Sequence, residues 1–125
     1  MPGKGRDQRK HPRIDSRFPI RSGADPHDHL EMESLNLSLE GVYCSTVRYV
    51  PVMAKLLLTL HLPAVPGLTP PSPEGIQTEA VVVRVEPDPD GKGERYNLAL
   101  FFSQIAKEDR VRLAEFLDLE RKIKE

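Results

Sequence analysis

Residues 76–102 read IQTEAVVVRVEPDPDGKGERYNLALFF and decide the fold class. The segments 76–86 and 95–102 are rich in β-branched and aromatic side chains, which favour extended backbone on a half-buried sheet. Between them, residues 87–93 hold two prolines, two aspartates and two glycines, and this composition predicts a hairpin loop. The stretch therefore predicts two antiparallel strands that are neighbours in a sheet.

The chain before this stretch continues the strand pattern. Four further segments carry apolar residues in alternation or in short runs: 14–22, 30–37, 42–47 and 52–62. The last of them is apolar enough to be a helix, but Pro51 and Pro63 bound it and favour a strand. Residues 63–75, with five prolines and two glycines, predict a loop. The region before residue 76 is therefore expected to supply most of the remaining strands.

The chain after the strands predicts a single helix over about residues 107–123. No Gly or Pro occurs there, and Leu113, Phe116 and Leu117, with Ala114, share one helical face. Five or six short strands joined by tight turns close most easily into a small barrel, which the helix then covers or packs beside. The expected fold class is mainly β, a small six-stranded antiparallel β-barrel with a C-terminal α-helix.

Length and composition exclude several classes of protein. The 125 residues, 38% of them apolar, suffice for one domain with a sizeable core. No apolar run approaches the roughly 18 residues of a membrane-spanning helix, and the polar N-terminus is not a secretory signal. Cys44 is the only cysteine, so neither an internal disulfide nor a thiolate metal cluster is expected. The composition fits the reducing cytoplasm.

Charge is distributed unevenly along the chain. The formal net charge is −1, yet residues 1–22 carry +5 and residues 23–125 carry −6. The domain organisation expected is a flexible basic arm over residues 1–13 and one barrel domain over residues 14–125. Such an arm is either a solvated tail or a segment that binds an anion.

Two short motifs contain candidate binding residues. Arg9 and Arg13 form an R-x-x-x-R spacing, and two guanidinium groups can bind phosphate oxygens or the O6/N7 edge of guanine in bidentate fashion. In the stretch N-x-S-x-x-G, Asn36 can present an amide to a base, and Ser38 can donate to a phosphate or brace a turn. Gly41 permits a backbone conformation that a side chain would forbid. Each motif alone is also compatible with an ordinary tail or turn.

Taken together, the motifs resemble those of the PilZ domain family, receptors for the bacterial second messenger cyclic di-GMP. The family carries R-x-x-x-R followed by [D/N]-x-S-x-x-G, and the resemblance extends from about residue 8 to about residue 119. The strand residues 80–85 and 96–102 and the terminal helix follow the family's closing pattern. The family fold, a six-stranded barrel with a C-terminal helix, agrees with the order of elements inferred above.

The resemblance assigns roles to particular residues. It implies that Arg9 and Arg13 hold the phosphates and the guanine edges, while Asn36 contacts a guanine. It also implies that Ser38 and Gly41 shape the turn beneath the ligand.

The resemblance adds two further basic residues to the candidate site. Arg84 stands where family members often place an aromatic or basic side chain against a guanine, so its guanidinium is expected to stack there. Gln8 favours one bound ligand per site, and Lys10 leaves two possible.

The function implied by the resemblance is that of a receptor. Cyclic di-GMP would order the N-terminal arm, which would then relay the signal to a protein effector of unknown identity. No nucleophile–base pair, metal site or cofactor site is recognisable, so an enzyme is not expected. Long nucleic acid is not an expected partner, because the chain has no Trp and its three Tyr are scattered. The alternative is a PilZ-type adaptor that binds a protein without the nucleotide.

Overall fold

The computed structural model describes residues 13–23, 30–63, 75–89 and 94–124. The predictions for the basic arm, and for most of the loops at 63–75 and 87–93, fall outside these ranges. The described elements, in chain order, are β1 (Ile14–Asp15), β2 (Pro19–Ser22), β3 (Leu30–Leu37), β4 (Gly41–Thr46), β5 (Lys55–Leu60), β6 (Ile76–Pro87), β7 (Tyr96–Ile105) and α1 (Lys107–Lys124).

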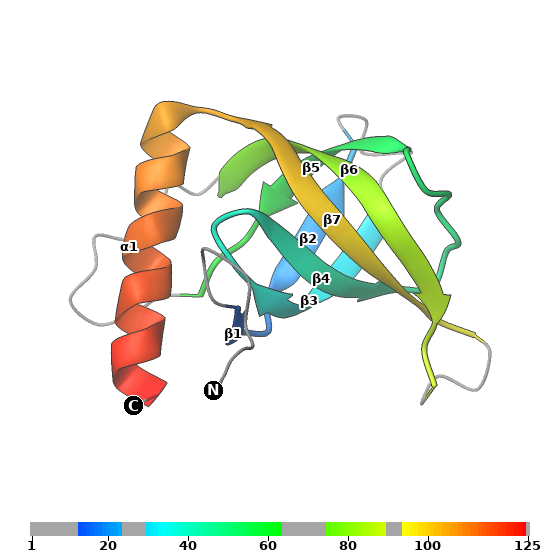
Figure 1. Ribbon diagram of the computed structural model, residues 1–125, viewed down its shortest axis with the longest axis horizontal. Coiled ribbons are helices and arrows are strands. Elements are labelled where there is room, and N and C mark those ends of the chain that lie inside the picture. The colour runs from blue at the N-terminus through cyan, green and yellow to red at the C-terminus, as the bar shows by residue number, and fades with distance from the viewer. Residues whose placement is uncertain (1–12, 24–29, 64–74, 90–93, 125) are drawn as a thin grey trace, which may run out of the picture.

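Six of the strands close into an antiparallel barrel. The hydrogen-bonded order is β3-β2-β5-β6-β7-β4, and β4 returns to pair with β3. In Figure 1 the long β6 and β7 run side by side with β4 next to β7, and the sheet wraps round a closed interior. The predicted six-stranded barrel is confirmed, and the short β1 is one extra strand paired with β3.

The predicted strand at 14–22 is wrong in its continuity, because it is divided into β1 and β2. Ser34 on β3 explains the break: its hydroxyl donates to the carbonyl of Ser16 and accepts the N–H of Phe18 at 2.8 Å. Its own N–H donates to the carbonyl of Phe18 at 3.0 Å. The interrupted backbone is therefore hydrogen-bonded by a buried side chain instead of by a sheet ladder.

The strand predicted at 52–62 is confirmed as a strand but is shorter. Residues 52 and 53 form a turn, and Met53 has a φ of 78° in the left-handed region, which strand residues do not adopt. In contrast, β7 runs three residues beyond its expected end, because Gln104 and Ile105 still pair with Glu79 and Thr78 of β6.

The helix α1 stands across one end of the barrel (Figure 1). Leu113 and Phe116 are fully buried, and the Phe116 ring meets Phe18 edge to face at 6.5 Å between centroids. Ala114, predicted on the same face, is exposed, so the buried stripe is narrower than expected. The buried core residues of the barrel include Ile20, Leu37, Val42, Leu58, Leu60, Ile76, Val82, Leu98 and Leu100. No helix among the described residues is long and apolar enough to cross a membrane.

Candidate functional site

A row of cross-strand partners on the outer surface of the barrel brings the predicted residues together. Asn36 on β3 pairs with Tyr43 on β4, Tyr43 pairs with Ala99 on β7, and Ala99 pairs with Arg84 on β6. Arg13, just before β1, joins them at the Asn36 end. These five residues line a hollow of about 240 Å³, which we call the Arg13–Arg84 hollow.

Two β-bulges turn the ends of this row outward. The pairing register shifts between Ser34 and Asn36 on β3 and between Val82 and Arg84 on β6. Ser34 and Val82 are fully buried, so strict alternation would point the residues two positions later into the core. Each bulge adds one residue and reverses the phase, which leaves Asn36 and Arg84 facing the hollow.

The Arg13 and Asn36 side chains are in direct contact. Nη1 of Arg13 donates a hydrogen bond of 2.9 Å to Oδ1 of Asn36, across 23 residues of sequence. That contact uses the acceptor oxygen of the Asn36 side chain and orients its amide nitrogen, a donor, for a ligand. The polar groups that this end of the hollow offers a ligand are therefore hydrogen-bond donors.

At the other end, Arg84 lies beside Tyr43 and Glu86. Its guanidinium carbon is 5.8 Å from the centre of the Tyr43 ring, and its Nε is 3.9 Å from Oε1 of Glu86. The same carboxylate oxygen accepts a 2.6 Å hydrogen bond from the Tyr43 hydroxyl. Burial and this bond to Glu86 together raise the pKa of Tyr43, so the hydroxyl stays a donor at neutral pH.

Ser38 and Gly41 lie in the turn between β3 and β4. Ser38 is 1% exposed; its hydroxyl accepts the N–H of Glu40 at 3.2 Å, and its own N–H donates to the carbonyl of Gly41. This geometry favours the turn-bracing role for Ser38 over donation to a phosphate.

The reason for glycine at position 41 differs from the one expected. Gly41 is not among the glycines with positive φ, which are Gly23 and Gly75 in the described ranges. A Cβ at position 41 would instead overlap the backbone carbonyl oxygen of Leu100. Glycine therefore permits close approach of β4 and β7, not an unusual backbone angle.

The remaining predicted residues, Arg9 and Lys10, lie outside the described residues. Tyr43 and Glu86 are functional candidates that the sequence analysis missed. Strand alternation could have indicated Tyr43, because it lies between the buried Val42 and Cys44 of β4 and therefore points outward. In the described ranges, no group of three or more His, Cys, Asp or Glu side chains could hold a metal ion.

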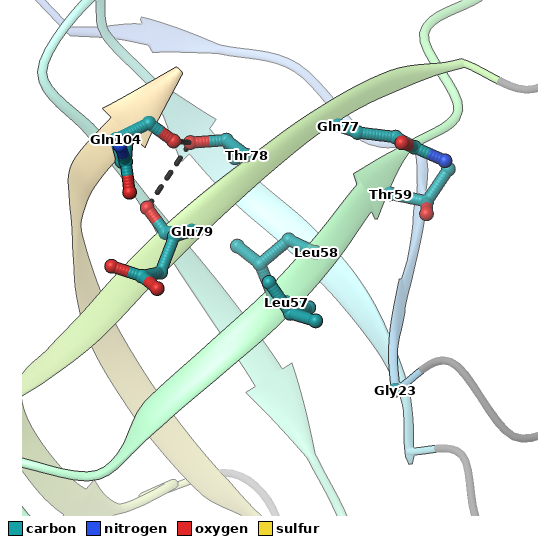
Figure 2. A pocket seen from close by; sticks show the side chains of 8 residues that line it. All are labelled: Gly23, Leu57, Leu58, Thr59, Gln77, Thr78, Glu79 and Gln104. Atoms are coloured by element: carbon teal, nitrogen blue, oxygen red, sulfur yellow. Dashed lines mark hydrogen bonds between the residues drawn. The ribbon is translucent and has the colours of Figure 1, made fainter. Parts of the chain in front are cut away.

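A larger hollow of about 350 Å³ lies over β5 and β6, and Figure 2 shows Leu57, Gln77 and Glu79 around it. Glu79 is the only charged residue in its lining, and the Thr78 hydroxyl is already bonded to the carbonyl of Gln104 at 2.9 Å. None of the predicted site residues lines it. The smaller Arg13–Arg84 hollow, which has two guanidinium groups, is therefore the better candidate for an anionic ligand.

The family model described as the PilZ domain matches residues 7–119. Among curated proteins, no sequence matches the chain significantly.

Several solved structures share the fold. The Bacillus subtilis inhibitor of motility (MotI/DgrA) is 24% identical with a TM-score of 0.74, over 98% of this chain and 55% of that chain. The PilZ domain of Escherichia coli YcgR with c-di-GMP is 16% identical with a TM-score of 0.66, over 94% and 95% of the two chains. The K. pneumonia MrkH–c-di-GMP complex is 18% identical with a TM-score of 0.66, over 95% and 56%. The chain thus spans about half the length of the MotI/DgrA and MrkH chains.

Proposed function

The chain belongs to the PilZ domain family, and from this premise we propose that it is a cyclic di-GMP receptor and not an enzyme. The observation that carries the proposal is the hollow on which Arg13, Asn36 and Arg84 converge. Two of its structural neighbours, YcgR and MrkH, are recorded with c-di-GMP. The fold is therefore one that accommodates this ligand in related proteins, and we propose that the hollow binds it here.

The chemistry of the hollow favours guanine over adenine. Guanine presents two acceptors, O6 and N7, on one edge, whereas adenine presents the N7 acceptor beside an N6 donor. The guanidinium groups and the Asn36 amide nitrogen are donors, so adenine would leave one donor facing another. The phosphates of a cyclic dinucleotide are further acceptors for the same groups.

The hollow is small enough that we expect it to hold only part of the ligand. Its volume of about 240 Å³ is below the roughly 300–1,000 Å³ of typical small-molecule pockets. We propose that it receives one guanine and the adjoining phosphate, while Arg9 and Lys10 of the basic arm bind the rest. Ordering the arm costs about 1–2 kcal/mol per residue, which the charge-assisted hydrogen bonds must exceed.

Calorimetry with cyclic di-GMP tests binding directly. Arg13→Ala removes both a phosphate ligand and the anchor of Asn36, so the affinity should fall by about 100-fold or more. Arg17→Ala is the matched control, because Arg17 is exposed and lies outside the hollow. Absence of binding by folded wild-type protein, or equal losses in the two variants, would contradict the proposal.

The relay to a protein effector is a separate step of the proposal. We propose that the bound ligand orders residues 1–13 and that the ordered arm, with the surface beside it, is what a protein target binds. Amide hydrogen exchange measures this step: cyclic di-GMP should slow exchange in the arm of the wild-type protein. In Arg13→Ala, exchange should stay fast, and equal slowing in both proteins would separate the arm from the site.

A protein-binding adaptor without nucleotide is the second candidate. It is favoured by the likeness to the inhibitor of motility and by the exposed apolar side chains of Val83 and Phe101 on β6 and β7, the strands that carry Arg84 and Ala99. Folded protein that fails to bind cyclic di-GMP would favour this function.

We further propose that the protein works in the bacterial cytoplasm, where its single thiol, Cys44, would stay reduced.

A further inference from the structure

We propose that Tyr43 and Glu86 are positioning residues that hold the Arg84 guanidinium over the Arg13–Arg84 hollow. The inference rests on the proposed function, since Arg84 matters there only as a group that binds the ligand. It adds two residues that belong to neither sequence motif and come from different strands, β4 and β6.

The restraint on Arg84 comes from two sides. The Tyr43 ring lies beneath its guanidinium carbon at 5.8 Å, within the range of a cation–π contact. Oε1 of Glu86 lies 3.9 Å from its Nε. Without such restraints, a side chain that is 64% exposed would sample many rotamers and lose that freedom on binding.

The Tyr43 ring is itself fixed at its hydroxyl. The hydroxyl donates to Oε1 of Glu86 at 2.6 Å. Glu86 is itself held in β6, where it pairs with the buried Asn97 of β7. One carboxylate oxygen therefore connects the ring and the guanidinium, so that both keep the orientation that opens toward the hollow.

A double-mutant cycle distinguishes positioning through Arg84 from direct contact with the ligand. Tyr43→Leu should weaken cyclic di-GMP binding by about five-fold in the wild-type background. In the Arg84→Ala background it should have no further effect, because the group that Tyr43 positions is gone. Tyr49→Leu is the matched control, since Tyr49 is 57% exposed and lies outside the hollow, and its affinity should equal that of the wild type.

A second measurement needs no ligand. Relaxation of the Arg84 Nε–H group by NMR reports how far its side chain is restrained on the picosecond to nanosecond timescale. The order parameter should fall in Tyr43→Leu and in Glu86→Ala while the thermal midpoint stays within a few degrees. An equally rigid Arg84 in both variants, or the same loss of affinity with and without Arg84, would overturn the inference. Failure of the wild-type protein to bind cyclic di-GMP would instead overturn the proposed function.

Discussion

Arg13 and Asn36 belong to different sequence motifs, and each depends on the other for its position. The hydrogen bond of 2.9 Å between them fixes the Asn36 amide and holds Arg13 at the rim of the hollow. Asn36→Ala removes the acceptor, so we expect the affinity for cyclic di-GMP to fall by about ten-fold. Asn36→Asp keeps an acceptor for Arg13 but loses the amide donor to the ligand, so its affinity should fall less than that of Asn36→Ala, and the difference measures the contact with Arg13. Calorimetry that gives the same affinity for Asn36→Ala and the wild type would contradict this coupling.

The buried thiol of Cys44 makes the stability of the barrel depend on pH. Burial raises the pKa of its thiol from 9.0 to about 12, so the folded protein resists deprotonation there. Its contribution to stability is complete below the unfolded pKa and is lost as the pH rises toward the folded pKa. The wild type should therefore lose about 1–2 kcal/mol more stability than Cys44→Ala between pH 8 and about pH 10.5. Urea unfolding at both pH values measures this, and parallel losses in the two proteins would contradict the assignment.

At the scale of elements, the site depends on two bulges that the sequence pattern did not reveal. The bounds of β3 were predicted correctly, and Asn36 and Arg84 were correctly placed in or beside strands. The face on which they lie follows from the register shifts at Leu35 and Val83, since one extra residue reverses every later side chain. Nothing in the local composition distinguishes a bulged Leu or Val from an ordinary strand residue. Motif spacing pointed to Asn36 and the family resemblance to Arg84, while their position on one face required the three-dimensional pairing.

The same limit explains the other differences from the sequence analysis. The break between β1 and β2 depends on Ser34, a residue of a later strand that hydrogen-bonds to Ser16 and Phe18. The period of α1 identified Leu113 and Phe116 as buried but did not define the width of the contact, which leaves Ala114 exposed. Local pattern predicted the type and order of the elements. Contacts made between distant segments were not encoded in any single window.

The contact between β4 and β7 gives a prediction at the level of elements. A Cβ at position 41 would overlap the Leu100 carbonyl, and backbone cannot move aside as a flexible side chain would. Gly41→Ala should therefore lower the free energy of unfolding by about 1–3 kcal/mol, the usual cost of overpacking. Glu40→Ala, one residue earlier in the same turn, is the control. Chemical denaturation with an unchanged midpoint for Gly41→Ala would show that the strands can separate without cost.

At the scale of the whole molecule, we expect the distribution of charge to select which anions bind. The net charge of −1 conceals +5 on residues 1–22 and −6 on residues 23–125. A small dianion bound between the arm and the hollow would interact mainly with the basic residues 1–22. A long polyanion would also be repelled by the net negative charge of residues 23–125. Long duplexes bind through many phosphate contacts, and the repulsion acts over about 8 Å at physiological salt.

This asymmetry predicts selectivity by ligand length. At about 150 mM salt, calorimetry should detect cyclic di-GMP binding, whereas a labelled duplex of about 20 base pairs should give no anisotropy change at the same protein concentration. Lowering the salt should strengthen cyclic di-GMP binding, because its contacts are charge-assisted. Duplex binding comparable to that of cyclic di-GMP would mean that the arm acts independently of the body. The hollow would then not determine specificity as proposed, because in the proposal the hollow is what distinguishes a guanine from a phosphate chain.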